Sequence, residues 1–230
     1  MRVVLFDLDG TLVSCGGAGR RALERALADR CGPLDGRLAP LRLDGMTDRL
    51  IVREALGILA HPFSEETRDQ ILARYLLHLA LEVAGPGYAV LPGAVEALER
   101  LRAAGVAYGL CTGNLVEGAR LKLARGGLDR HFEWNAGAVG GFGADGEARE
   151  RLVIAAVRRA AVRLGEALAP SEVLVVGDTP RDIAAAHAAG CPALGVATGR
   201  FTAAELAACG ADHVAGSLAE PAAVRLLGGP

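Results

Sequence analysis

Outside residues 18–84, short apolar runs alternate with helix-like stretches, and this alternation constrains the fold more than any other feature. Each run stops at a polar or glycine-rich turn before a helix-like stretch begins. Such a pattern predicts an α/β fold with a parallel sheet wrapped by helices, because parallel strands need crossover connections that are usually helical. The predicted strands are residues 3–8, 106–111, 173–176, 193–196 and 212–214. The predicted helices between them are residues 93–104, 115–125, 149–164, 182–189 and 203–208.

Residues 18–84 break the alternation, because their hydrophobic periodicity is helical throughout. Helices are predicted at residues 18–30, 47–59 and 64–83. Cys15-Gly16-Gly17 precedes this region and Gly85-Pro86-Gly87 follows it, and glycine gives a connection backbone freedom. We interpret the region as a helical module on two flexible linkers that acts as a movable lid, with rigid packing on the sheet as the alternative. The predicted domains are a core of residues 1–15 and 88–230 and a helical cap of residues 16–87.

Composition narrows the possible partners and location of the chain. Its 230 residues are 51% apolar, which is enough for a substantial core, and the net charge of -2 gives no general attraction to nucleic acid. The five cysteines have no metal-binding spacing, which is typical of a reduced, cytoplasmic protein. No uncharged apolar run approaches the roughly 20 residues of a membrane span, and the apolar N-terminus is too short for a signal peptide. We expect a cytoplasmic protein without a nucleic-acid or membrane partner.

Two aspartates lie at the carboxyl end of the first predicted strand, in Asp7-Leu8-Asp9-Gly10-Thr11. Strand alternation places Asp7 and Asp9 on a common side, close enough to disfavour double ionisation unless a cation lies between them. The motif therefore indicates a divalent metal site. Taken alone, it is equally typical of a turn with an aspartate cap.

Polar groups also follow two later strands of the predicted sheet. Thr112-Gly113-Asn114 leads into a helix and resembles an anion cradle, in which a hydroxyl and amides at a helix start face a negative charge, or a plain helix cap. Gly177-Asp178-Thr179-Pro180-Arg181-Asp182 puts carboxylates at a third strand end and at the next helix start, where a capping role is the alternative. Ligands of parallel sheets bind beyond the carboxyl ends of the strands, so these motifs are the candidates for a common site.

The three motifs, in this order and with a helical insert after the first, resemble the haloacid dehalogenase superfamily. Asp7 to Thr11 and an insert of the first cap type are similar to its phosphoglycolate phosphatase-like branch. The resemblance covers essentially the whole chain. It implies a Rossmann-like, doubly wound core with an inserted helical cap, and a phosphatase that acts on a small phosphorylated metabolite, with phosphoglycolate as the default substrate.

The resemblance also assigns roles to residues. Asp7 is expected to be the nucleophile that forms an aspartyl-phosphate, and Asp9 the acid and base of the two half-reactions. Mg²⁺ is expected on the carboxylates of Asp7 and Asp178 and the backbone carbonyl of Asp9, with Asp182 as an outer support of the metal site. The phosphate oxygens are expected to be held by Thr112, Gly113 and Asn114. Thr112 is also expected to be a catalytic residue.

A cation that neutralises the transferring phosphoryl group is usually a lysine before the third motif in this superfamily. The segment 145–152 contains none, because the 25 basic residues of the chain are 24 arginines and a single lysine, Lys122. We predict that Arg149 takes this role because it opens a helix, with Arg151 as its rival. Lys122, on the helix after Thr112, is a third candidate for binding the substrate. The alternative is that Lys122 is a solvated lysine on the helix surface. Arginine can bind phosphate bidentately, although its planar fork is not interchangeable with an ammonium group.

Residues of the same motifs distinguish other reactions of the superfamily from the hydrolysis of a phosphate ester. Dehalogenation needs neither the second carboxylate of the first motif nor a metal, so Asp9 and Asp178 argue against it. A phosphomutase stays open, whereas a signalling phospho-acceptor would lack Asp9 and the cap. In the cap, the turn 45–48 is a candidate to face the active site. Arg20, Arg42 or Thr47 would then contact the leaving group of the substrate. The alternative is that these are surface residues without such a role. The sequence leaves a monomer or a homodimer open.

Overall fold

The computed structural model of the chain describes residues 1–135 and 137–228. Its larger part is built on a six-stranded sheet in the order β5-β4-β1-β6-β7-β8, in which every neighbouring pair is parallel. The strands are β1 (Val3–Phe6), β4 (Ala107–Cys111), β5 (Gly140–Gly141), β6 (Val173–Gly177), β7 (Ala193–Val196) and β8 (His213–Ala215). The predicted α/β fold with a parallel sheet is therefore confirmed.

Alternate residues of β1 face the two sides of the sheet, as the pleat of a strand requires. Val4 and Phe6 belong to one apolar core with residues of α4 (Ala94–Ala103), α5 (Val116–Arg125) and α9 (Pro221–Leu226). Val3 and Leu5 belong to a second core with residues of α6 (Arg149–Leu164), α7 (Pro180–Ala188) and α8 (Ala203–Ala208). Short 3-10 helices span Asp129–His131 and Pro170–Glu172. The sheet is thus covered on both faces, as in a doubly wound fold.

The central position of β1 determines where a ligand can bind. The chain leaves β1 to build β4 and β5 on one side and then returns to build β6, β7 and β8 on the other. A crevice forms at the carboxyl end of the strand where the order reverses, and parallel sheets bind ligands there. Asp7, Thr112 and Asp178 follow the three adjacent strands β1, β4 and β6, so all three lie at this edge.

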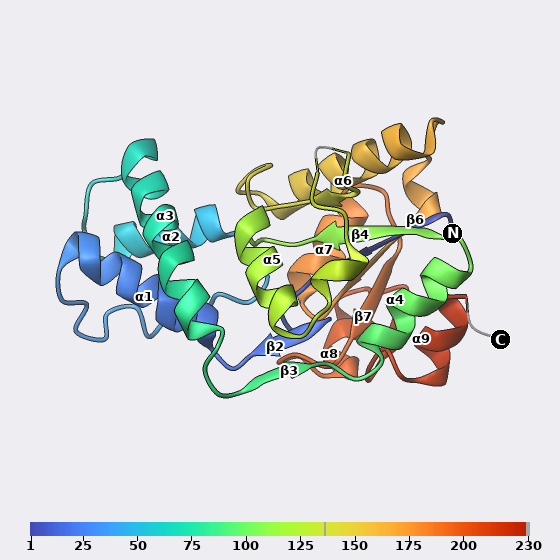
Figure 1. Cartoon of the computed structure of the whole chain (residues 1–230), viewed down its shortest axis with the longest axis horizontal. Helices are drawn as coiled ribbons and strands as arrows, with labels where there is room; N and C mark the ends of the chain where they lie inside the picture. The colour runs from blue at the N-terminus through green and yellow to red at the C-terminus, as the bar shows by residue number, and fades with distance from the viewer. Residues whose placement is uncertain (136, 229–230) are drawn as a thin grey trace.

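Three helices form the part of the molecule that lies to the left in Figure 1: α1 (Ala18–Cys31), α2 (Asp48–Ile58) and α3 (Glu65–Glu82). Each begins and ends within one residue of its predicted bounds. Thr47 and Ser64 cap α2 and α3 by accepting hydrogen bonds from backbone N–H groups of the first turns. Their buried side chains, among them Leu27, Leu56 and Leu79, form a third apolar core separate from the two of the sheet.

The two connections to these helices pair with each other as a short β-ribbon. Val13–Cys15 (β2) pairs antiparallel with Tyr88–Val90 (β3), as the lower part of Figure 1 shows. Beyond this ribbon the chains cross so closely that a Cβ atom on Gly16 would lie 2.7 Å from the carbonyl oxygen of Pro86. This ribbon was not predicted, because strands of three residues are too short for a detectable periodicity, and the movable lid stays a prediction.

The remaining differences from the predicted elements are local. The strand β1 ends at Phe6 and not at residue 8, because the carbonyl of Leu8 accepts backbone hydrogen bonds from a tight turn at Thr11 to Val13. Helix α7 begins at Pro180, two residues earlier than predicted, because Thr179 and Asp182 form a reciprocal capping box. The short elements β5 and α9 were not predicted. Across the described part of the chain, no helix combines the length and apolar character that a bilayer crossing requires.

Candidate active site

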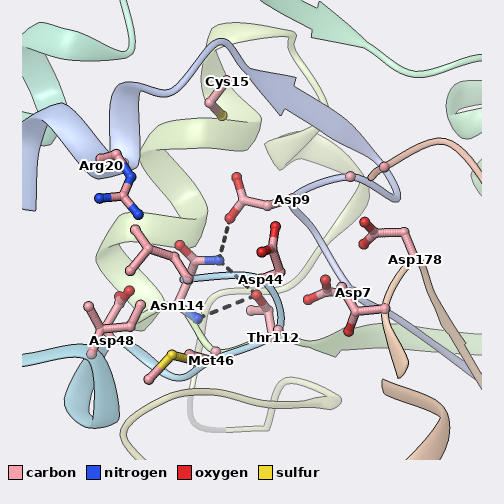
Figure 2. A pocket seen from close by; sticks show the side chains of 18 of the residues that line it. Asp7, Asp9, Cys15, Arg20, Asp44, Met46, Asp48, Thr112, Asn114 and Asp178 are labelled. Carbon is pink, nitrogen blue, oxygen red and sulfur yellow. Dashed lines mark hydrogen bonds between the residues drawn. The ribbon is translucent and has the colours of Figure 1, made fainter. Parts of the chain in front are cut away.

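A cavity of about 410 Å³ lies where the carboxyl ends of β1, β4 and β6 face the cap helices. Figure 2 shows Asp7, Asp9, Thr112, Asn114 and Asp178 around it, together with side chains that come from the cap. Residues singled out from the sequence that line this cavity are Asp7, Asp9, Arg20, Arg42, Thr112, Gly113, Asn114, Lys122, Arg149 and Asp178. The predicted meeting of the three motifs therefore occurs at a single cavity.

Asp7 is buried at the floor of this cavity, directly after β1. Its backbone N–H donates to the carbonyl of Val176 at 2.8 Å, which fixes the residue to the neighbouring strand β6. An Nη2 atom of Arg149 lies 2.8 Å from Asp7 Oδ1 and also contacts Asp182 Oδ1. Burial raises the pKa of Asp7 to about 7, although the positive charge of Arg149 opposes the rise. Arg149 is itself buried, so its charge is directed at these two carboxylates.

Three buried carboxylates crowd one side of the cavity. Oxygen atoms of Asp7, Asp178 and Asp182 all lie within 4.8 Å of one another. Burial, together with repulsion from Asp182 and Asp7, raises the pKa of Asp178 to about 9. Glycines make room for Asp178, since a Cβ atom on Gly10 or Gly199 would lie within 2.3 Å of its Oδ2. An all-oxygen group whose members resist joint ionisation fits a hard divalent cation.

Asp182 differs from the other two carboxylates because both of its oxygens have protein partners. Its Oδ2 accepts hydrogen bonds from the backbone N–H of Thr179 at 3.0 Å and from the Thr179 hydroxyl at 2.6 Å. Its Oδ1 is the partner of Arg149. This arrangement fits the support role expected for Asp182 better than direct contact with a cation.

Asp9 is held by a separate set of partners on the other side of the cavity. Lys122 Nζ donates to Asp9 Oδ2 at 2.5 Å, and Asn114 Nδ2 donates to the same oxygen at 2.9 Å. Burial favours a raised pKa for Asp9, but the charge and hydrogen bond of Lys122 and the Asn114 amide outweigh burial and bring that pKa below its ordinary value. These partners favour the ionised form of Asp9, which is the form that can accept a proton.

Lys122 and Asn114 both line the cavity and are bonded to other side chains there. Lys122 is buried, so the alternative of a solvated surface lysine was wrong. Asn114 Oδ1 accepts from Lys122 Nζ at 2.7 Å. Asn114 Nδ2 also donates to Thr112 Oγ1 at 2.8 Å, as Figure 2 shows. The side chain of Asn114 is thus engaged with protein groups, whereas the Thr112 hydroxyl keeps its proton for another acceptor.

The cap turn at residues 45–48 touches the second motif directly. The backbone N–H of Asp48 donates to the carbonyl of Gly113 at 2.8 Å, and the Asp48 carboxylate accepts from the backbone N–H of Leu115 at 2.9 Å. A Cβ atom on Gly113 would lie 2.1 Å from the carbonyl oxygen of Met46, so this contact requires glycine. Burial raises the pKa of Asp48 to about 6. The sequence made this turn a candidate to face the active site, and Gly45, Met46 and Asp48 do line the cavity. The pairing of Asp48 with the start of α5, however, left no local signal in the sequence.

Other candidates from the sequence lie in different surroundings. Arg151 is exposed and does not line the cavity, which leaves Arg149 as the basic residue of that segment at the site. Thr47 caps α2 and donates its hydroxyl to the carbonyl of Glu147 at 3.1 Å. Arg20 lines the cavity but donates to Glu24 and to the backbone carbonyls of Leu38 and Leu41. Arg42 lines the cavity from an exposed position.

Comparison with known proteins agrees with this geometry. The sequence model of the haloacid dehalogenase-like hydrolases matches residues 1–190. A phosphoglycolate phosphatase of Rhodospirillum rubrum is 36% identical over 197 residues, which cover 83% of this chain and 77% of that protein. A probable phosphatase of Dickeya dadantii, IndB, is 32% identical over 209 residues, which cover 90% of this chain and 85% of that protein.

Solved structures support the same fold. A predicted phosphoglycolate phosphatase from Haemophilus somnus superimposes with a TM-score of 0.68 at 21% identity, covering 95% of each chain. A hydrolase from Pseudomonas syringae gives a TM-score of 0.67 at 22% identity, again over 95% of each chain. The predicted superfamily, fold and enzyme class are thereby confirmed. The chain belongs to the haloacid dehalogenase-like hydrolases and is a phosphatase that resembles the phosphoglycolate phosphatases.

Proposed function

We propose that this chain is a Mg²⁺-dependent phosphatase that hydrolyses a small phosphorylated metabolite through an aspartyl-phosphate on Asp7. The observation that carries the proposal is the Asp7 carboxylate itself, which lies in the cavity 2.8 Å from Arg149 and beside Asp178. Phosphoglycolate is the first substrate to test, because the relative in Rhodospirillum rubrum is named for it. A cavity of about 410 Å³ suits a small-molecule substrate.

Mg²⁺ is the proposed cation, because hard oxygen donors in near-octahedral geometry suit it. The carboxylates of Asp7 and Asp178 and the backbone carbonyl of Asp9 would hold it, with Asp182 supporting the site through Arg149 and Thr179. When bound, the cation supplies positive charge that lets a carboxylate approach the phosphate anion. The crowding that raises the pKa of Asp178 to about 9 supports a cation at this position.

Two carboxylates of the chain carry out the reaction, with Asp7 as the nucleophile and Asp9 as the acid and base. An oxygen of Asp7 attacks phosphorus, the bond between phosphorus and the leaving oxygen breaks, and Asp9 gives that oxygen a proton. In the second step Asp9 takes a proton from water, which attacks phosphorus, releases phosphate and restores Asp7. Arg149, the Thr112 hydroxyl and the Gly113 amide are proposed to hold the phosphoryl oxygens, while the Asn114 side chain orients Asp9.

The test is a panel of phosphorylated metabolites assayed with Mg²⁺, phosphoglycolate included. We expect turnover of at least one alkyl phosphate, its loss after chelation with EDTA, and its loss in Asp7→Asn. Asp29→Asn, which removes a carboxylate on the exposed side of α1, is the matched control and should keep full activity. Full activity of Asp7→Asn on a phosphoester would overturn the proposal.

Two alternative functions of the chain would give different outcomes in this assay. A phosphomutase would convert one hexose phosphate isomer into another without net release of phosphate. A phospho-acceptor module would form a long-lived phosphoprotein and release no phosphate. The predicted cytoplasmic location, the absence of nucleic-acid and membrane partners, and the choice between monomer and homodimer stay predictions.

A further inference from the structure

We propose that Lys122 is a positioning residue for Asp9, which it holds by one carboxylate oxygen so that the other faces the leaving group of the substrate. This inference rests on the proposed function, because it needs Asp9 as the proton donor and acceptor. It removes Lys122 from the list of candidates for neutralising the phosphoryl group. Lys122 instead serves the leaving-group side of the reaction.

The first support is the division of the two Asp9 oxygens. Lys122 at 2.5 Å and Asn114 at 2.9 Å both donate to Oδ2, and neither donates to Oδ1. The Asp9 side chain nevertheless keeps 43% of its accessible surface, and Asp9 lines the cavity. One oxygen is therefore anchored while the carboxylate stays open to a substrate. A proton donor acts efficiently only when it is held in reach of the reacting atom.

The second support is the enclosure of Lys122. Its side chain is only 5% exposed, and Asn114 Oδ1 accepts its second hydrogen bond at 2.7 Å. Cap helices cover it, since a Cβ atom on Gly19 of α1 would lie 3.6 Å from Lys122 Nζ and 3.9 Å from the hydroxyl of Tyr75 of α3. A compact ammonium group with three donors suits such a space, and the planar fork of arginine is not interchangeable with it. This accounts for a lysine here in a chain whose other 24 basic residues are arginines.

The third support is the separation of the two buried cations. Arg149 makes its ion pairs with Asp7 and Asp182, and Lys122 makes its ion pair with Asp9. Each cation thus serves a different carboxylate. The phosphoryl group transfers to Asp7, so Arg149 is on the correct side to neutralise it, and Lys122 is on the side where the leaving oxygen departs.

The test compares leaving groups that differ in their need for a proton. An alkyl phosphate, phosphoglycolate first, expels a basic oxygen that must be protonated, whereas p-nitrophenyl phosphate expels an anion that is stable without a proton. The quantity kcat/KM reports the steps up to the first phosphoryl transfer. We expect Lys122→Met to lower kcat/KM for the alkyl phosphate by about 100-fold or more and to change that for p-nitrophenyl phosphate only slightly.

A double mutant separates action through Asp9 from direct action. In an Asp9→Asn background, Lys122→Met should cause little further loss on the alkyl phosphate, because the group that it positions has already been removed. Equal losses on both substrates, or losses that multiply in the double mutant, would show that Lys122 binds the phosphoryl group and would overturn the inference. Lys122→Gln, which keeps a hydrogen-bond donor without the charge, provides a second variant should Lys122→Met fail to fold.

The control variant and the wild type complete the design. Arg125→Met removes an exposed positive charge one turn further along α5 and should leave both substrates unaffected. Failure of the proposed function has a different signature, because the wild type would then hydrolyse neither substrate or Asp7→Asn would stay active. Equal losses of kcat/KM on both substrates in Lys122→Met, with an active wild type, would contradict the positioning role alone.

Discussion

At the scale of single residues, the two buried cations of the cavity pair with different carboxylates, Arg149 with Asp7 and Lys122 with Asp9. Arg149 could be selected over Arg151 because it opens a predicted helix, and it lies against Asp7. The burial of Lys122 could not be predicted, because its partner Asp9 is 113 residues away and its cover comes from helices of the cap. The engagement of the Asn114 amide by Asp9 was likewise invisible in the sequence.

The role of Arg149 gives a prediction at this scale. Arg149→Met should lower kcat/KM for p-nitrophenyl phosphate by about 10³-fold, because a buried guanidinium beside the nucleophile stabilises the transferring phosphoryl group. Arg151→Met, two residues away and exposed, should retain wild-type kinetics. Steady-state assays with Mg²⁺ measure both variants. Similar losses in the two variants would show that the segment acts through its general charge and not through Arg149.

At the scale of elements, the order of the strands and helices could be predicted from the hydrophobic periodicity of the sequence. The contacts by which these elements dock on one another could not. Helices of ten or more residues have enough turns to show an apolar face, so the three cap helices were predicted within one residue at each end. The ribbon of β2 and β3 has only three residues a strand and was missed. The hydrogen bonds that join Asp48 to Gly113 and Leu115 depend on tertiary packing and leave no local pattern.

The docking of α2 on the second motif predicts different outcomes for two glycines. Gly113→Ala should lower kcat/KM strongly, because its Cβ would lie 2.1 Å from the carbonyl oxygen of Met46 and would push the cap turn away from the cavity. Gly118→Ala, inside α5, meets only ordinary contacts at 3.5 Å and should keep activity while raising the free energy of unfolding by about 0.5–1 kcal/mol. Kinetics and thermal melts of the pair test this, and an active Gly113→Ala would contradict it.

At the scale of the whole molecule, the buried carboxylates link stability to pH and to the metal. In the metal-free protein the pKa of Asp7 is raised to about 7 and that of Asp178 to about 9. The folded state therefore binds more protons than the unfolded chain between about pH 4 and pH 9. Because the excess protons are lost as pH rises, the free energy of unfolding of the metal-free protein should decrease across this range.

Thermal melts in EDTA and in Mg²⁺ measure this linkage. We expect the melting temperature in EDTA to fall from pH 5 to pH 9, and Mg²⁺ to raise it more at pH 9 than at pH 5. Asp178→Asn should flatten the pH slope and weaken the response to Mg²⁺, whereas Asp29→Asn should follow the wild type. A melting temperature in EDTA that rises with pH, or that has the same slope in Asp178→Asn, would contradict the account.

The most direct measurement of the central claim is the capture of the phosphorylated nucleophile. Asp9→Ala lacks the base of the second step but needs no acid to expel p-nitrophenol, so rapid acid quench should show a burst of about one p-nitrophenol per enzyme without matching phosphate. Mass spectrometry of the quenched protein should place the phosphoryl group on Asp7. Phosphate released together with p-nitrophenol and no adduct, or an adduct on another residue, would contradict nucleophilic catalysis by Asp7.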